Sequence, residues 1–390
     1  MPALMLRYVV LLVCSTLIAG SAFNPWHFNS PNARQAQLSL LKRSPQSFFL
    51  DVRRAGLLLP ELSDGTVLAL RKLDEPAAAF EWAIRLIEQG DLDTALLLAR
   101  AHWEATASQA HLRLLESLTT AHAVSEINLL ASHFALPRPY YTLSRVMQGA
   151  SASELASDDL QQLTIRTVNE LHWDDAKCIR RVAMLSDSWL GFKKLQQLKA
   201  QYLSAPLPHS GSYCFADPVY MGSDLQCHLK AQKFAYCDLA GLPGSAYWSA
   251  ADHLVLMTKR GDANVSRGVM TLNLNSDYAV FVHELMHFSG FEDEYAIDEA
   301  KAQWLCATPG FKAPNLYVGN TPPKGWYPSQ SCEAGLLSAY KPQQAMSNMQ
   351  YQSLALSKRY KELWLLAFQQ QRDKPTDFQR FIQVKLAAKG

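Results

Sequence analysis

The 390-residue sequence lacks an excess of either charge. It contains 37 basic and 35 acidic residues, which gives a formal net charge of +2. Proteins that attract nucleic acid or an anionic membrane through their overall electric field carry a strong basic excess. The near balance therefore predicts that nucleic acid is not a partner.

The sequence also lacks the polar bias of a disordered chain. Hydrophobic residues make up 48% and charged residues 18%, which is ordinary for a globular protein. The length exceeds what one typical hydrophobic core organises. We therefore expect two domains, or one domain with a long helical attachment.

The N-terminus lacks an apolar run of the roughly 20 residues that cross a bilayer. Its apolar run, Tyr8 to Ala19, is shorter, follows Arg7, and precedes the small residues Gly20-Ser21-Ala22. This order is typical of a signal peptide and its cleavage site. We predict a signal peptide at residues 1–22, an exported protein that is periplasmic or secreted, and no stable membrane span after cleavage. An uncleaved N-terminal anchor is the alternative.

No two cysteines form the C-x-x-C pair that is typical of structural zinc sites. Removal of residues 1–22 takes away Cys14, one of seven cysteines, and leaves six in a chain bound for an oxidising compartment. We therefore expect three disulfides. The sequence leaves several pairings open, and we expect Cys306 to pair with Cys332 across a loop rich in proline and glycine. The other four are Cys178, Cys214, Cys227 and Cys237.

Glycine and β-branched runs are scarce between Leu38 and Leu203, where apolar residues recur at intervals of three and four. This pattern predicts an all-helical domain, which we place at residues 35–205. Residues 79–96 predict one helical hairpin with a turn at Gly90-Asp91. The hairpin is faintly similar to a tetratricopeptide unit, but no regular repeat follows.

The composition changes at residues 206–212, PLPHSGS, which predict a linker and a second domain at residues 206–390. Leu254–Thr258 and Val269–Leu272 predict short strands. A helix is expected to begin near Asn275-Ser276-Asp277, whose small polar side chains can cap its first amide groups. The sequence thus predicts an α+β protein in which an all-helical domain precedes a mixed one.

The predicted helix carries the motif His283-Glu284-x-x-His287, which places two imidazoles on one helix face and Glu284 beside a metal-activated water. Chance supplies this short pattern too often for it to identify a site. Gly290 and Asp293 extend it to the far rarer H-E-x-x-H-x-x-G-x-x-D. A glycine with positive φ would end the helix and return the chain, so that Asp293 reaches the metal.

A catalytic zinc site needs three protein ligands and one open position. We therefore predict that Zn²⁺ is bound by both histidines of the motif and by Asp293, with Glu284 as the general base. Glu292 and Glu294, on either side of Asp293, are alternative third ligands. His172, His228 and His253 stand at no ligand spacing, and we interpret them as structural residues.

The extended motif resembles that of the metzincin family of zinc peptidases, in which the third ligand is usually histidine and in some members aspartate. The family also has a methionine turn, often S-x-M-x-Y, which Ser347-Asn348-Met349-Gln350-Tyr351 matches. The resemblance implies that Met349 is an apolar floor under the ligands, with Met346 as the alternative. It also implies that Tyr351 binds the metal or the developing oxyanion. Asp293-Glu294-Tyr295 is loosely similar to a triplet of the IgA-peptidase group.

The resemblance covers roughly residues 251–371. It implies a metzincin-like domain with a twisted mixed sheet, an active-site helix, a methionine turn and a closing helix near Leu354 to Gln370. The implied activity is that of an exported zinc metalloendopeptidase acting on proteins or peptides. Two other hypotheses assign the helical domain a role: it binds a protein partner beside a structural zinc fold, or it covers the metal cleft until it is removed.

Overall fold

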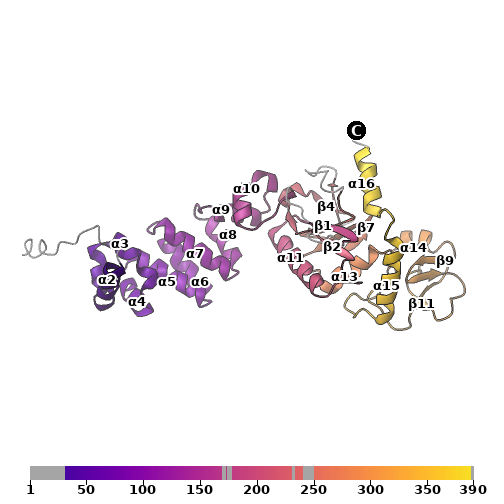
Figure 1. Ribbon diagram of the computed structural model, residues 1–390, viewed down its shortest axis with the longest axis horizontal. Helices are drawn as coiled ribbons and strands as arrows, with labels where there is room; N and C mark the ends of the chain where they lie inside the picture. Colours follow the sequence, from indigo (N-terminus) through magenta and orange to yellow (C-terminus); the bar gives the residue numbers. More distant parts are fainter. Residues whose placement is uncertain (1–30, 169–172, 174–177, 231–232, 240–249, 388–390) are drawn as a thin grey trace, which may run out of the picture. The chain divides into compact units, whose positions relative to one another are not determined.

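The computed structural model describes residues 31–168, 173, 178–230, 233–239 and 250–387 (Figure 1). The chain forms two compact units, Met1–Pro137 and Arg138–Gly390. This division lies before the linker predicted at residues 206–212. The signal peptide predicted at residues 1–22 lies outside the described residues. No helix within the described ranges is long and apolar enough to cross a membrane.

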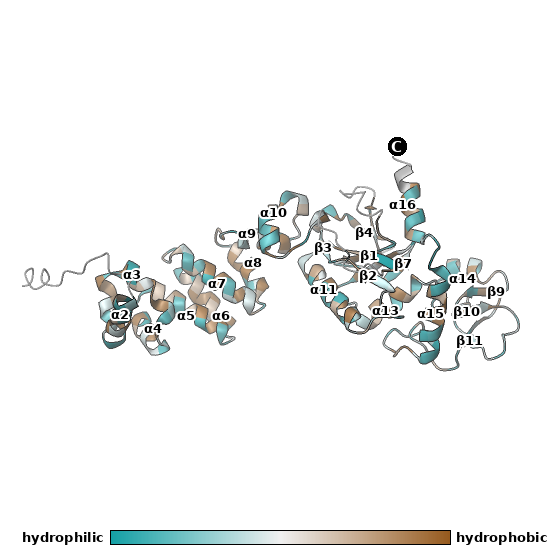
Figure 2. Cartoon of the chain, in the orientation of Figure 1, coloured by the Kyte–Doolittle hydropathy of each residue, from teal (hydrophilic) through white to brown (hydrophobic). Residues whose placement is uncertain are grey.

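Every regular element described in the first unit is a helix. Figure 2 shows hydrophobic and hydrophilic residues side by side along these helices, as expected of amphipathic helices. Leu41, Phe48 and Leu70 belong to one buried cluster of this unit. The α-helices are α2 (Pro31–Arg43), α3 (Val52–Gly56), α4 (Asp64–Arg71), α5 (Pro76–Glu88), α6 (Leu92–His102), α7 (Ser108–Thr120) and α8 (Val124–Ala131).

Helices α5 and α6 form the predicted hairpin. Gly90 has a φ of 85°, a conformation that glycine adopts without strain. The Asp91 carboxylate accepts a hydrogen bond of 3.2 Å from the backbone nitrogen of Thr94 and so caps α6. The hairpin predicted at residues 79–96 is confirmed.

A mixed sheet is the centre of the second unit. Its order is β2-β1-β6-β8-β7, with β3 also paired to β1; all described neighbours are parallel except β7, which is antiparallel to β8. The structure is therefore mixed α and β, with helices alone in the N-terminal part. The strands are β1 (Arg180–Ser186), β2 (Tyr213–Phe215), β3 (Val219–Tyr220), β6 (His253–Thr258), β7 (Asn264–Ser266) and β8 (Val269–Asn273).

Strand β1 lies inside the region for which the sequence predicted only helices, and that prediction is wrong for residues 180–186. The strand is covered on both faces: Val182 and Met184 belong to one core cluster, and Ala183 and Leu185 belong to another. A strand buried on both sides has no alternation of polar and apolar residues. The sequence of β1 therefore has no period of two that would predict a strand.

The predicted linker is an internal loop of the second unit. It connects α11 (Trp189–Ser204) to β2. The hydroxyl of Tyr202 donates a 2.7 Å hydrogen bond to the carbonyl of Leu207, which holds the loop against the helix. Its proline- and glycine-rich composition thus indicates a turn within one unit.

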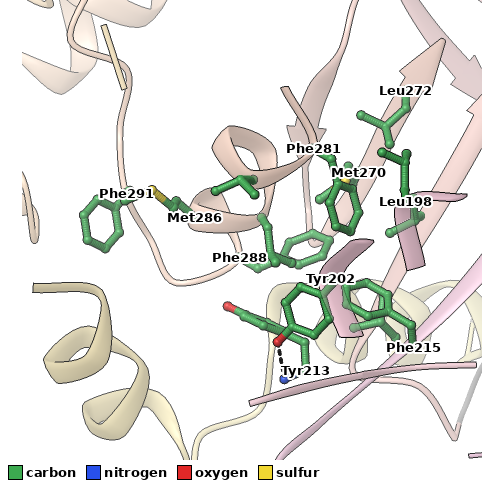
Figure 3. Close-up of a cluster of buried hydrophobic side chains, with 14 of the residues drawn as sticks. Leu198, Tyr202, Tyr213, Phe215, Met270, Leu272, Phe281, Met286, Phe288 and Phe291 are labelled. Atoms are coloured by element: carbon green, nitrogen blue, oxygen red, sulfur yellow. Dashed lines mark hydrogen bonds between the residues drawn. The ribbon is translucent and has the colours of Figure 1, made fainter. Parts of the chain in front are cut away.

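Helices cover both faces of the sheet. On one face, α11, α13 (Tyr278–His287) and α15 (Lys358–Gln371) contribute to one large hydrophobic cluster, and Figure 3 shows Leu198, Met270 and Phe281 within it. On the other face, α16 (Asp377–Ala387) contributes Phe378, and a hairpin of β4 (Cys227–Lys230) and β5 (Phe234–Cys237) adds Cys237. The predicted strands at β6 and β8, and the predicted closing helix at α15, are confirmed within a few residues.

The remaining elements precede the sheet or lie between α13 and α15. A four-stranded antiparallel sheet of order β11-β12-β10-β9 packs with α14 around the Cys306–Cys332 disulfide. That predicted pairing is confirmed, and the other two disulfides are Cys178–Cys214 and Cys227–Cys237. These elements are α9 (Tyr140–Met147), α10 (Ser157–Gln162), α14 (Glu299–Leu305), β9 (Gly310–Ala313), β10 (Leu316–Val318), β11 (Tyr327–Ser329) and β12 (Ala339–Lys341).

Gly268, in the turn between β7 and β8, lies so close to α16 that it leaves no room for a side chain. It has a φ of 71°, and a Cβ there would lie 2.6 Å from the backbone nitrogen of Phe378 at the start of α16. We expect Gly268→Ala to lower the free energy of unfolding by at least about 2 kcal/mol, measured by chemical denaturation. Gly325→Ala is the control, because Gly325 has a φ of 81° and open space around it. Equal losses in the two variants would show that the close packing of α16 has no effect.

Candidate metal centre

Helix α13 presents the motif residues from a well-capped start. The Asp277 carboxylate accepts a 2.9 Å hydrogen bond from the backbone nitrogen of Val280, as the predicted cap requires. Phe281 and Leu285 are fully buried in the core cluster. Since helix positions three and four apart share a face, His283 and His287 project together on one side.

Gly290 ends the helix and reverses the chain. Its φ is 79°, and its backbone nitrogen donates a 2.9 Å hydrogen bond to the carbonyl of His287. Phe291 then donates back to the carbonyl of Met286 at 3.4 Å. This left-handed glycine end brings the following residues under the last turn of the helix, and the expected positive φ is confirmed.

Asp293 meets both histidines after this reversal. Its Oδ1 lies 3.2 Å from Nε2 of His283 and 3.3 Å from Nε2 of His287. All three side chains are largely buried: 1% of His283 and 14% of each of the other two are exposed. The structure therefore brings together the three ligands predicted from the sequence.

The other ring nitrogen of each histidine is bound to a backbone carbonyl. Nδ1 of His283 lies 2.8 Å from the carbonyl oxygen of Asn348, and Nδ1 of His287 lies 2.7 Å from that of Phe291. A carbonyl only accepts, so each Nδ1 carries the proton. In the neutral form of each ring this leaves the lone pair on Nε2, facing Asp293, which is the tautomer that binds a metal ion.

These distances fit a tetrahedral cation site. Ligand atoms that lie about 2.0–2.2 Å from a zinc ion at tetrahedral angles are about 3.3–3.6 Å from one another, and the two observed distances lie at the short end of this range. The Oδ1 atom of Asp293 is buried and has no hydrogen-bond partner in the described part of the chain, although both Nε2 atoms are near. A buried acceptor between two lone pairs has no complement unless a proton or a cation binds there.

The carboxylates on either side of Asp293 have other partners. Glu292 forms a 2.6 Å ion pair with Lys301. Glu294 is fully buried and accepts a 2.8 Å hydrogen bond from Asn315. The geometry therefore favours Asp293 over both alternatives as the third ligand.

Glu294 joins the ligand loop to distant parts of the unit. The hydroxyls of Ser347 and Tyr360 donate to its carboxylate, and its backbone nitrogen donates a 3.0 Å hydrogen bond to the carbonyl of Met349. Ser347 and Met349 belong to the predicted methionine turn, and Tyr360 lies on α15. The same turn supplies the Asn348 carbonyl that orients His283, so Glu294 acts on the site through the turn.

The residues of the methionine turn lie in different environments. Met349 is fully buried in the core cluster that includes Met286 and Phe291, whereas Met346 is 59% exposed. The side chain of Tyr351 is 51% exposed and is absent from the described residues that line the cleft at Glu284. Burial thus favours Met349 over Met346, and the prediction for Tyr351 stays a prediction.

Glu284 lies beside the two histidines of the candidate site. Its Oε2 lies 4.0 Å from Nε2 of His287 and is buried without a hydrogen-bond partner in the described structure. Burial raises the pKa of this carboxyl above its ordinary value. Such a carboxyl accepts a proton more readily than an exposed one near neutral pH.

The charges of the ligand group are coupled. Burial alone would raise the pKa of Asp293, but the two histidines lower it overall. Burial alone would lower the pKa of His287, but the Asp293 carboxylate raises it to about 9. Without a bound metal ion, the chain therefore retains a proton between Asp293 and His287, and a metal ion would displace that proton.

A cleft of about 800 Å³ opens at this group. Its lining includes Glu284, His287, Asp293, Val265 of the edge strand β7, and Tyr295. The sequence motifs did not single out Tyr295 as a site residue. Burial and the Asp293 carboxylate raise the pKa of its phenol, which therefore stays protonated and can donate a hydrogen bond. The triplet Asp293-Glu294-Tyr295 was the only signal in the sequence.

Another histidine, His253, also lines the cleft but is a packing residue. Its ring is buried and stacks on Phe288 with 4.0 Å between centroids. Burial and nearby Arg180 lower its pKa to about 3, so the ring is neutral at ordinary pH. This agrees with the structural interpretation made from the sequence.

No model of a known protein family matches the chain, and no curated protein matches it in sequence.

The Glu294 network predicts a stability difference between neighbouring residues. Glu294→Ala removes a buried carboxylate to which several donors point, and we expect it to lower the free energy of unfolding by about 3 kcal/mol. Glu292→Ala removes one partly exposed ion pair, and its loss should stay below about 1 kcal/mol. Chemical denaturation of both variants measures the difference. Similar losses would contradict the structural role assigned to Glu294.

Proposed function

We propose that this protein is an exported zinc-dependent peptidase of the metzincin type. The observation that carries the proposal is the position of Asp293, whose Oδ1 lies 3.2 Å from Nε2 of His283 and 3.3 Å from Nε2 of His287, close to the separation of two ligand atoms of one tetrahedral ion. The mixed sheet, α13, the Gly290 turn, the methionine turn and the closing helix α15 also follow one another in the order that the resemblance implies.

The donor set fits zinc. Two imidazoles and one carboxylate leave a fourth position open toward the cleft, as a catalytic zinc site requires. A zinc ion bound there would polarise a substrate carbonyl and lower the pKa of water. A site built only for structure has no need of the buried, unpaired carboxyl of Glu284.

The chain's own residues can manage the proton transfers of peptide hydrolysis. Glu284 takes the proton from the attacking water, and its carboxyl then gives that proton to the nitrogen of the leaving amine as the peptide bond breaks. Tyr295 lies in the same cleft with its phenol protonated and can donate to an oxygen of the substrate. Hydrogen bonds to the carbonyls of Asn348 and Phe291 keep the rings of His283 and His287 in a fixed orientation.

The edge of the sheet favours an extended peptide as substrate. Strand β7 is the last strand in the sheet order, and its residues Asn264 and Val265 line the cleft that contains Glu284. An extended peptide can add to such an edge through backbone hydrogen bonds, which do not depend on its sequence. This arrangement suits peptide substrates better than small compact ones.

Export is supported by the cysteines. The described residues contain three disulfides, which form and persist in oxidising compartments. Together with the signal sequence predicted at residues 1–22, they support the proposal of an activity in the periplasm or outside the cell.

Metal content tests the ligand assignment. The purified protein is expected to retain one zinc ion per chain after dialysis, as measured by elemental analysis, whereas His283→Ala and Asp293→Ala should lose it. Glu292→Ala is the matched control and should retain the metal, because its carboxylate pairs with Lys301. Retention by Asp293→Ala with loss by Glu292→Ala would reassign the third ligand.

Removal of the general base tests the reaction. Glu284→Gln should keep the zinc and lose peptide hydrolysis by a factor of about 10²–10⁴, because the amide cannot accept the proton. The assay compares the variant with the parent protein on an unstructured protein substrate, with metal content measured in parallel. Full activity in Glu284→Gln would overturn the proposed mechanism.

A further inference from the structure

The cleft at Glu284 is lined by charged side chains of both signs. Its described lining contains six cationic residues and five acidic ones, a balance that by itself suggests no preference. The cations are Arg180, Lys233, Arg267, Lys301, Lys374 and Arg380; the acids are Glu284, Glu292, Asp293, Asp298 and Asp377. The two groups differ in how many of their members are already paired.

The acidic residues are all used inside the protein. Asp293 and Glu284 belong to the metal centre, and Asp298 caps α14 by accepting a 2.9 Å hydrogen bond from the backbone nitrogen of Lys301. The other two acids each pair with one of the cations, and a third cation pairs with an aspartate outside the lining. These pairs are Glu292 with Lys301 at 2.6 Å, Asp377 with Arg380 at 2.5 Å, and Asp252 with Arg180 at 3.4 Å.

Three cations remain without a carboxylate partner among the residues that the structure describes: Lys233, Arg267 and Lys374. All three are exposed. The ammonium of Lys233 lies 4.9 Å from the ring centre of Phe234, and the guanidinium of Arg267 lies 5.4 Å from that of Phe381. An aromatic ring positions a cation without neutralising it, so these charges stay available to a ligand.

Two of the free cations lie on segments that are packed or hydrogen-bonded to other parts of the second unit. Arg267 is in the β7–β8 turn, which packs closely on Phe378 at the start of α16. The backbone nitrogen of Lys374 donates to the carbonyl of Gln371, whose side-chain amide donates to the carbonyl of Ser289 in the glycine turn. Both side chains line the same cleft as Val265 of β7 and Glu284.

We infer that this cleft selects peptides with acidic side chains flanking the bond to be cleaved. This inference rests on the proposed function, because it takes the cleft as the substrate site. Free lysine and arginine side chains favour carboxylates and disfavour basic residues, while Glu292 and Asp377 are paired with cations and Asp298 caps a helix. Arg267 and Lys374 are the residues that determine this specificity.

Direct binding tests the inference without requiring cleavage. Three fluorescein-labelled peptides that share one sequence, with glutamates, glutamines or lysines at the same positions, are titrated with full-length zinc-loaded Glu284→Gln protein and followed by fluorescence anisotropy. The glutamate peptide should bind roughly tenfold more tightly than the lysine peptide at low salt. This ratio should shrink as salt screens the exposed charges.

Charge reversal assigns the effect to named residues. In the same background, Arg267→Glu combined with Lys374→Glu should weaken binding of the glutamate peptide by about tenfold and strengthen that of the lysine peptide. Lys361→Glu is the matched control, because Lys361 is an exposed cation of α15 outside the cleft; it should change neither affinity. Circular dichroism verifies that the variants are folded.

The outcomes separate the inference from the proposed function. Equal affinity for the glutamate and lysine peptides, no binding of the glutamate peptide, or equal effects of Lys361→Glu and the cleft variant would overturn the inference. Cleavage by the parent protein without acidic preference would leave the peptidase proposal standing. Tight, charge-dependent binding with no cleavage by the parent protein would support the inference and count against the peptidase.

Discussion

The buried carboxylate of Glu294 is the constraint on which the metal centre depends. A charge with no exposure to water is retained only where donors surround it, and here they come from Asn315, Ser347 and Tyr360. Asn315 lies between α14 and α15, Ser347 in the methionine turn, and Tyr360 on α15. Satisfying one carboxylate therefore fixes the mutual positions of three segments around the ligand loop.

This arrangement explains how a short loop can hold ligands to the accuracy that catalysis needs. The Asn348 carbonyl that orients His283 belongs to the turn tied to Glu294, and the Phe291 carbonyl that orients His287 belongs to the loop that carries Asp293. Each of the two histidines is thus positioned by a carbonyl that is itself held, so the candidate site is already arranged in the structure without a metal ion. Preorganisation of this kind is a general requirement of catalytic sites.

The local parts of the site could be predicted from the sequence. His283 and His287 share a helix face by spacing alone, and Gly290 and Asp277 mark the helix ends through backbone chemistry that acts within four residues. The motif spacing predicted Asp293 as the third ligand but left Glu294 open as an alternative, because the partners of Glu294 are donors 21 to 66 residues away along the chain. The hydrogen-bond partners of Glu294 can be identified only in the folded chain.

Two further differences have similar causes. The motif S-x-M-x-Y predicted a role for Tyr351, but Tyr295 is the tyrosine that lines the cleft. Which phenol reaches the cleft depends on the path of the loop, and the motif does not indicate that path. The match to the methionine turn nevertheless located a segment that contacts His283 through a backbone carbonyl. A contact made by a backbone carbonyl does not depend on the side chain of its residue, so the sequence cannot indicate it.

The position of β1 has a consequence for how the chain can be divided. This strand pairs with β2, β3 and β6, so it is an inner strand of the sheet although it precedes the others in sequence. A cut between α11 and β2, where the composition suggests a linker, would remove it and expose unpaired edges on either side. Any natural processing that frees the second unit from the first helices therefore has to act before residue 180, and the region near Pro137 is where the compact units part.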